Sequence, residues 1–281
     1  MMFFPKSAIQ WFRFSAFVLV AIAFLVYVGR SIRSLQFRLL YYPSSSSPSA
    51  ELLQANRLKI WQSSGADYHG LLAADEASPK MGTVVVFHGN AGTAADRTYY
   101  SDALCALGYR VILAEYPMYG GRGGELGEKA FVGDARETIR LAFEECGGPI
   151  FLLGESMGCG IVAAAAAERP VPIEGIILIT PWDTLEAIGR SKFPFFPVRL
   201  LLQDKYDSIG NLASFTGRVA VVGATRDAVI PIEHAKNLYA SLPGTSKRLW
   251  IIQDAGHNDW NVHVNRDWWE QMMGFVSGSR R

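Results

Sequence analysis

The stretch Pro149-Ile150-Phe151-Leu152-Leu153-Gly154-Glu155-Ser156-Met157-Gly158 decides the fold. Its first half is a continuous apolar run, which is typical of a strand that is covered on both faces in a parallel sheet. Small residues dominate the segment that follows, 159–167, and they predict a helix that packs closely on that sheet. The sequence therefore predicts a strand, a sharp turn at Ser156 and a helix.

Strands and helices alternate along the rest of the chain. Further apolar runs occur at residues 83–87, 110–114, 176–179, 219–222 and 249–252. Helical segments lie between them, at residues 97–107, 129–145 and 233–242. This alternation predicts an α/β fold with a mostly parallel, doubly wound sheet and flanking helices. Residues 58–62 and 68–73 are expected to form an antiparallel hairpin at one edge, and one domain accounts for residues 51–281.

The amino terminus differs in composition from this domain. Residues 14–28 carry no charge and are almost wholly apolar. As a helix, residues 11–29 would extend about 28 Å, close to the roughly 30 Å hydrocarbon core of a bilayer. A cleaved signal peptide is the rival interpretation, but no small-x-small cleavage site follows the run. A core helix is the other, but a helix apolar on every face has no side for solvent. The sequence thus predicts one transmembrane helix, a membrane anchor within residues 1–35.

The flanking charges do not choose the side of the membrane on which the domain lies. Three arginines follow the apolar run, and two basic residues with the terminal amine precede it: Arg30, Arg33, Arg38, Lys6 and Arg13. The positive-inside rule needs a clear imbalance, which these numbers do not give. Residues 36–50, with serines at 44–47 and 49, are expected to be a flexible linker or exposed loop.

Composition excludes several classes of function. The formal net charge is +1 and no block of basic residues occurs, which argues against a nucleic-acid partner. The cysteines Cys105, Cys146 and Cys159 are odd in number and lack C-x-x-C spacing, so they predict neither disulfides nor a zinc site. They are expected to be small buried residues. No metal or other cofactor is predicted, and the composition carries no signal for an oligomeric state.

Ser156 has the surroundings of a nucleophile. In an open parallel sheet, ligands bind beyond the carboxyl ends of the strands, where this serine is expected. A sharp strand-to-helix turn leaves no room for side chains at the two flanking positions, and Gly154 and Gly158 remove them. The amino terminus of the following helix favours a developing negative charge. The alternative, an ordinary glycine-rich turn with an exposed serine, explains the strand and helix less well.

A serine hydroxyl needs an adjacent base that is held by an acid. His257 follows the last predicted strand and is the preferred base, whereas His263 lies nearer the final helix and is expected at the surface. Asp227 follows the strand 219–222 and is the preferred acid, with Asp183 as its competitor. A salt bridge between Asp227 and the adjacent Arg226 is the structural alternative.

The run His88-Gly89-Asn90-Ala91-Gly92 follows another predicted strand. The backbone N–H of Asn90, with that of Met157 after the nucleophile, is expected to form an oxyanion hole. His88 is expected to lock the loop by hydrogen bonds rather than to react.

These residues together resemble the α/β-hydrolase superfamily, and most closely its amino-terminally membrane-anchored serine hydrolases, the Bem46-like and depalmitoylase-like branch. The resemblance runs from residue 37 to the end of the chain and rests on these motifs: residues 88–92, the glycine-rich turn 116–124, residues 154–158, Tyr206-Asp207-Ser208, Asp227 with Pro231, and residues 256–259. It implies Ser156, Asp227 and His257 as the catalytic triad. One departure is Ala114-Glu115-Tyr116-Pro117, which stands where an Asp-Tyr-Arg-like sequence is common and is expected to alter the pocket wall.

The resemblance does not fix a substrate. The leading hypothesis is a serine hydrolase that cleaves carboxylic esters or thioesters through an acyl-enzyme. The alternatives are a peptidase or amidase on the same triad and a non-catalytic binding protein with this fold. Residues 181–218 leave room for a small cap with apolar segments at 193–197 and 200–202. These segments are expected to line an acyl pocket, to touch the bilayer or to form a buried connection. A small-molecule or lipid-like acyl substrate suits an anchored enzyme with such a cap.

Overall fold

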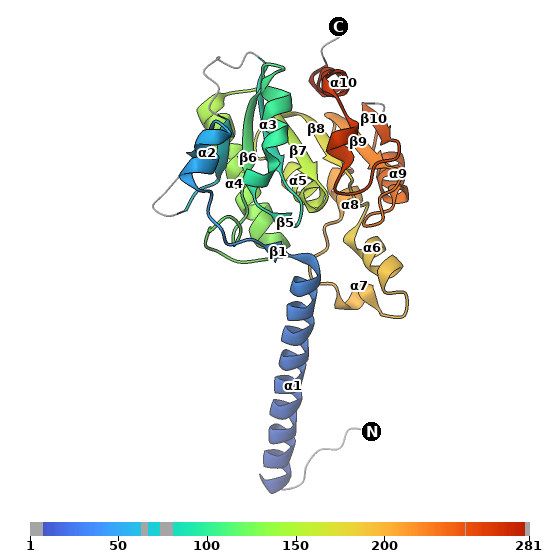
Figure 1. The fold of residues 1–281 in the computed structure, drawn as a ribbon. Coiled ribbons are helices and arrows are strands. Elements are labelled where there is room, and N and C mark those ends of the chain that lie inside the picture. The colour runs from blue at the N-terminus through green and yellow to red at the C-terminus, as the bar shows by residue number, and fades with distance from the viewer. Residues whose placement is uncertain (1–7, 63–66, 74–80, 245, 279–281) are drawn as a thin grey trace. The chain divides into compact units, whose positions relative to one another are not determined.

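The computed structural model describes residues 8–62, 67–73, 81–244 and 246–278 (Figure 1). The chain divides into two units, one ending at Leu40 and the other beginning at Tyr41, and each is described by itself. The first unit contains the helix α1 (Ala8–Leu40). The second contains every other helix and strand that the structure describes.

Helix α1 has the length and composition of a membrane span. Its segment Arg13–Leu40 is long and apolar enough to cross a bilayer, since 28 residues of helix extend about 42 Å. The apolar side chains of this helix are exposed on several of its faces, as Phe17, Leu19 and Val20 show. Such a helix needs an apolar surrounding on all sides.

The second unit is built on an eight-stranded sheet with the strand order β10-β9-β8-β7-β4-β6-β3-β2. Its strands are β2 (Leu58–Trp61), β3 (Gly70–Ala73), β4 (Thr83–Phe87), β6 (Arg110–Ala114), β7 (Ile150–Glu155), β8 (Ile173–Ile179), β9 (Arg218–Ala224) and β10 (Lys247–Ile252). The six strands β10, β9, β8, β7, β4 and β6 are neighbours in this order and pair in parallel. Strand β3 runs antiparallel to both β6 and β2. The mostly parallel sheet and the antiparallel hairpin at its edge are therefore confirmed.

Helices cover both faces of this sheet (Figure 1). They are α2 (Ala50–Ala55), α3 (Thr98–Cys105), α4 (Glu128–Cys146), α5 (Met157–Ala167), α6 (Leu185–Lys192), α7 (Val198–Leu201), α8 (Ser208–Leu212), α9 (Ile232–Ser241) and α10 (Arg266–Ser277). Helices α6 and α7 form the small cap that the sequence predicts, between β8 and β9.

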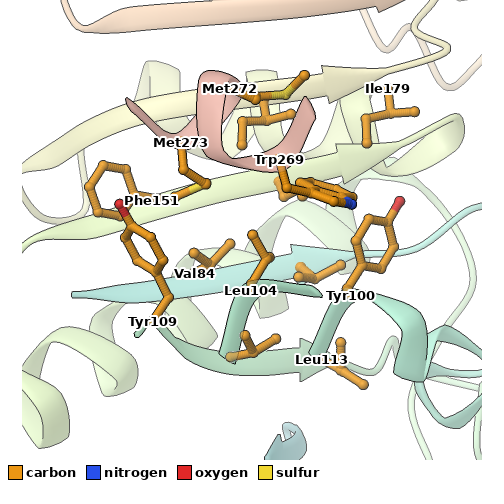
Figure 2. Packing of buried hydrophobic residues seen from close by; sticks show 14 of the residues in the cluster. Val84, Tyr100, Leu104, Tyr109, Leu113, Phe151, Ile179, Trp269, Met272 and Met273 are labelled. Carbon is orange, nitrogen blue, oxygen red and sulfur yellow. The ribbon is translucent and has the colours of Figure 1, made fainter. Parts of the chain in front are cut away.

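Alternate residues of the central strands serve the two faces, because side chains point to opposite sides along a strand. On one face, Val84 and Phe151 belong to a buried cluster with side chains of α3 and α10, among them Leu104 and Met273 (Figure 2). The side chain of Leu152, next to Phe151 along β7, points to the other face of the sheet. Helix α5 contacts β7 and β4, and helix α4 contacts β4. Both faces of the central strands are buried, and their sequences are therefore continuous apolar runs.

The boundary between helix α1 and the domain differs from the prediction of a linker at 36–50. Residues 36–40 are helical, and Tyr42–Pro43 form a short strand, β1, parallel to β5 (Ala91–Gly92). Residues 44–49 have no regular structure, yet they lie on the domain: the Ser44 carbonyl accepts from the Gly120 N–H at 2.8 Å. A pairing two residues long leaves no apolar periodicity in the sequence, so the pattern did not reveal it.

Truncating a buried side chain of a central strand should destabilise the domain. Leu152 is fully buried, so Leu152→Ala should lower the free energy of unfolding by about 2–5 kcal/mol through the lost transfer energy and the cavity. Chemical denaturation of the detergent-solubilised full chain measures this. Leu200→Ala is the matched control, because Leu200 is 83% exposed, and it should change the free energy by no more than about 0.5 kcal/mol. Equal effects of the two substitutions would contradict the assigned burial.

Candidate active site

Ser156 sits at a strained turn between β7 and α5. Its backbone has φ 52° and ψ −114°, a left-handed φ that non-glycine residues rarely adopt. A Cβ on Gly158 would lie 2.0 Å from the Phe87 carbonyl oxygen, and one on Gly154 would lie 2.6 Å from that of Gly158. Glycine at both positions is therefore what allows the turn to form against β4.

The structure brings Ser156, His257 and Asp227 together from three loops. His257 Nε2 lies 2.9 Å from Ser156 Oγ, and His257 Nδ1 lies 2.7 Å from Asp227 Oδ2. An ionised carboxylate only accepts hydrogen bonds, so Nδ1–H donates to Asp227 and a neutral Nε2 accepts from the serine hydroxyl. This is the arrangement in which an imidazole can take the hydroxyl proton.

Asp227 is fixed by its own loop. Its Oδ1 accepts from the backbone N–H groups of Val229 and Ile230 at 2.8 and 2.7 Å. The carboxylate is buried, and both of its oxygens are thereby satisfied. The adjacent Arg226 forms its ion pair with Asp254, at 2.5 Å, and not with Asp227.

The competing acid and base lie elsewhere in the domain. Asp183 accepts from His234 Nδ1 at 2.8 Å, and both side chains are buried. His263 lies 4.0 Å from Asp259 and is about one-third exposed. The hydrogen bonds from Ser156 and to His257 thus involve neither of them.

The loop after β4 is held next to the nucleophile by His88. A Cβ on Gly89 would lie 3.6 Å from Ser156 Cβ. His88 Nδ1–H donates to the Gly89 carbonyl at 2.7 Å, and His88 Nε2 lies 2.9 Å from Glu115 Oε1. The Gly89 carbonyl and the Asn90 N–H belong to one planar peptide. Fixing the carbonyl therefore also fixes the direction of the Asn90 N–H.

Strand β1 supports the same loop from the other side. The Tyr42 N–H donates to the Asn90 carbonyl at 3.0 Å, and the Tyr119 hydroxyl donates to it at 2.8 Å. Both peptide groups of Asn90 are consequently held, one through Gly89 and one through its own carbonyl. Met157, whose N–H is the second predicted oxyanion donor, is the first residue of α5 and is fully buried.

Glu155, directly before the nucleophile, is the centre of a hydrogen-bond network that the sequence did not reveal. Its carboxylate accepts from the Tyr99 hydroxyl at 2.6 Å, the Tyr100 hydroxyl at 2.7 Å and Arg97 Nε at 3.2 Å. Arg97 also donates to the Ala91 carbonyl at 3.2 Å, which ties the loop after β4 to the nucleophile turn. A charged residue ending an apolar strand is the signal that a buried network exists, but it does not name the partners.

Burial, and next the negative charge of Glu155, raise the pKa of Tyr100 well above its ordinary value. The phenol therefore stays protonated and remains a donor to the carboxylate. Glu115, at the departure from the common family sequence, has the corresponding role beside His88: it is 1% exposed and also accepts from the Ala94 N–H at 2.9 Å.

The cysteines only partly match expectation. Cys159 is buried, whereas Cys105 and Cys146 are half-buried, because they lie at the carboxyl ends of α3 and α4, where those helices leave the core. Among the described residues, none of the three forms a disulfide. In the part of the chain that the structure describes, no cluster of three His, Cys, Asp or Glu side chains could hold a metal ion.

Comparison with known proteins identifies the family. Residues 78–201 match the family described as serine aminopeptidase, S33. The structure of a Pyrococcus furiosus esterase superposes with a TM-score of 0.64 at 18% identity, covering 85% of this chain and 97% of that one. An uncharacterized protein of Mycobacterium tuberculosis is 32% identical over 255 residues, which are 88% of this chain and 90% of that protein.

The chain belongs to the α/β-hydrolase superfamily. The membership predicted from the sequence is thereby confirmed. Within this superfamily, the lysophosphatidylserine lipase ABHD12 of Danio rerio is 26% identical over 186 residues, covering 59% of this chain and 48% of that protein. The chain thus spans about half the length of ABHD12.

Removing one hydroxyl from the Glu155 network should weaken the fold. Tyr100→Phe deletes a fully buried donor to a carboxylate and should lower the free energy of unfolding by about 1.5–3 kcal/mol. Urea unfolding of the solubilised full chain measures the change. Tyr239→Phe, on a half-buried ring beside Lys247, is the control and should shift stability by about 0.5 kcal/mol or less. If both variants unfolded at the same urea concentration, the hydroxyl would have no such role.

Proposed function

We propose that this chain is a serine hydrolase that cleaves carboxylic ester or thioester bonds through an acyl-enzyme on Ser156. The observation that carries the proposal is the continuous pair of hydrogen bonds from Ser156 Oγ to His257 and from His257 to Asp227, at 2.9 and 2.7 Å. A weak nucleophile, a base in contact with it and an acid that orients the base are the parts such a reaction needs.

In the proposed first half-reaction, Ser156 Oγ attacks the substrate carbonyl carbon while His257 Nε2 takes the hydroxyl proton. The tetrahedral intermediate collapses, the bond to the leaving group breaks, and the imidazolium returns the proton to that group. In the second half-reaction, His257 takes a proton from water, which attacks the acyl-enzyme. The second tetrahedral intermediate collapses with cleavage of the bond to Ser156 Oγ, the imidazolium returns the proton to Oγ, and the carboxylic acid leaves. Asp227 stays ionised throughout and stabilises the imidazolium.

The negative oxygen of each tetrahedral intermediate is assigned to the backbone N–H groups of Asn90 and Met157. The closeness of Gly89 to Ser156 and the fixed peptide groups on either side of Asn90 support this assignment. Donors that are already oriented need no reorganisation when charge develops. The loss of one such donor typically costs about 10²–10³ in rate.

A lipid-like acyl substrate and a single-pass anchor belong to the same proposal. Helix α1 has the length of a membrane span, and the related ABHD12 is a lysophosphatidylserine lipase. The exposed apolar residues of the cap also favour an enzyme that works at a bilayer. Residues 1–7 of the predicted anchor lie outside the described residues.

A second candidate activity is hydrolysis of amides or peptides. It is favoured by one observation, the match of residues 78–201 to the family described as serine aminopeptidase, S33. The same triad would serve, with His257 protonating an amine instead of an alcohol or thiol.

Ser156→Ala should abolish both covalent labelling and turnover. The wild-type chain should react with a fluorophosphonate probe, and Ser156→Ala should not, with kcat lower by about 10⁶-fold. Turnover of acyl esters, thioesters and peptides measured side by side distinguishes the two activities: esters or thioesters should be preferred. Labelling that survives the substitution would sink the proposal, and a preference for peptides would favour the second candidate.

Asp227→Asn tests the acid. The amide would offer an N–H toward His257 Nδ1 and favour the wrong tautomer, so kcat should fall by about 10⁴-fold while the fold is kept. Asp254→Asn is the matched control, because Asp254 is an exposed aspartate that pairs with Arg226, and it should leave kcat near the wild-type value. A comparable loss in both variants would argue against Asp227 as the acid.

A further inference from the structure

The cap exposes a group of large apolar side chains, which we call the cap tip: Phe193, Phe195, Phe196 and Leu200. Their exposed fractions are 45%, 97%, 63% and 83%. They lie on the turn between α6 and α7 and on α7 itself, both seen in Figure 1. Single exposed apolar residues are common on soluble domains, but four large ones within residues 193–200 indicate a surface that binds a partner.

The cap tip is held outward by ordered backbone. Phe193 N–H donates to the Gly189 carbonyl at 2.8 Å, and Leu202 N–H donates to that of Val198 at 2.8 Å. Val198 is 8% exposed and packs onto α6, where a Cβ on Gly189 would come within 2.7 Å of its Cγ1. Burying Val198 in this way turns its neighbours toward solvent. The exposure is therefore a property of a folded segment.

Basic residues flank the cap tip along the chain. Between residues 190 and 205 the chain carries four basic residues, Arg190, Lys192, Arg199 and Lys205, and one acidic residue, Asp204. The whole chain, by contrast, is nearly balanced, with 27 basic and 26 acidic residues. Aromatic and leucine residues flanked by lysine and arginine are typical of a surface that enters the headgroup region of an anionic leaflet.

The chain enters the domain at the base of this same cap segment. Tyr41 is the first residue of the domain and directly follows Leu40 of α1. Its buried hydroxyl donates to Asp204 Oδ2 at 2.7 Å and lies 2.9 Å from the Tyr206 hydroxyl. Asp204 and Tyr206 end the segment that begins with the cap tip. The last residue of α1 is thus followed in the chain by a residue that is hydrogen-bonded to the end of the cap segment.

We propose that the cap tip docks into the interfacial region of an anionic leaflet of the bilayer that α1 spans. The apolar side chains enter the headgroup boundary, and the basic residues pair with lipid phosphate and carboxylate groups. The proposal rests on α1 being a membrane anchor, but not on the hydrolase activity. A second copy of the chain is the competing occupant. The basic residues beside the cap tip disfavour it, because two such positively charged surfaces would repel each other.

Docking would place the acid loop close to lipid. Lys192, the last residue of α6, donates from Nζ to the Ala228 carbonyl at 3.2 Å. Ala228 directly follows Asp227, so the cap and the loop that carries the acid share a contact. A surface that binds the bilayer through the cap therefore holds the candidate active site at the membrane surface.

Fluorescence in lipid nanodiscs tests the proposal on the full chain. An environment-sensitive fluorophore is attached at Phe195→Cys in a chain with Cys105→Ser and Cys146→Ser, while Cys159 is kept because it is fully buried. Discs of phosphatidylcholine with phosphatidylserine carry a spin-labelled lipid as quencher. Val262→Cys is the matched control, since Val262 is also exposed, at 76%, but lies in the turn before α10.

The fluorophore at position 195 should show blue-shifted, quenched emission in phosphatidylserine discs, and that at 262 should show neither. Replacing phosphatidylserine by phosphatidylcholine, or introducing Arg199→Gln, should lower the ratio of docked to undocked cap, by about fivefold for one basic residue. Quenching that is absent at 195, or equal at both sites, overturns the proposal. If the blue shift occurs without quenching by the spin-labelled lipid, and only in discs that hold two copies of the chain, the surface binds a second copy instead. The measurement needs no turnover, so Ser156→Ala can be used, and failure of the docking proposal is distinct from failure of the hydrolase proposal.

Discussion

The unusual backbone of Ser156 is the constraint on which the site depends. A left-handed φ of 52° at a residue with a side chain costs about 1–3 kcal/mol, and the surrounding sheet has to hold it. The Ser156 N–H donates to the Ile179 carbonyl at the end of β8, and the turn packs against the end of β4 through Gly158. Three neighbouring strands of the sheet order, β8, β7 and β4, thus end around one serine. The rigidity of a parallel core is what keeps the hydroxyl facing His257.

Three buried or nearly buried histidines each contact a carboxylate, and the three pairs are similar in length. They are His257–Asp227 at 2.7 Å, His234–Asp183 at 2.8 Å and His88–Glu115 at 2.9 Å. Of these three histidines, His257 is the one whose other ring nitrogen is hydrogen-bonded to Ser156. The pairing of histidine with acid is therefore a structural device that this domain uses repeatedly. What distinguishes the candidate catalytic pair is the nucleophile at its other end.

Much of this arrangement follows from the sequence, and the missing parts have a physical reason. Runs such as 83–87 and 110–114 are apolar on both faces, so their strand character and parallel pairing could be predicted and are observed. The positions of Asp227 and His257 followed from their place after strand ends. Glu155 and its donor Tyr100 are 55 residues apart, and neither periodicity nor composition encodes such a meeting. It arises only when α3 is laid against the sheet.

The two-residue pairing of β1 with β5 makes the first residues of the domain a support of the candidate active site. Tyr42 holds the Asn90 carbonyl, and Tyr41 is fastened to Asp204 and Tyr206. A protease that cut the chain before Tyr41 would release a domain with every support of this loop intact. A cut after Pro43 would release one without the strand that braces it. The position of a cut within these three residues would thus decide whether the released domain keeps the strand that supports its candidate oxyanion loop.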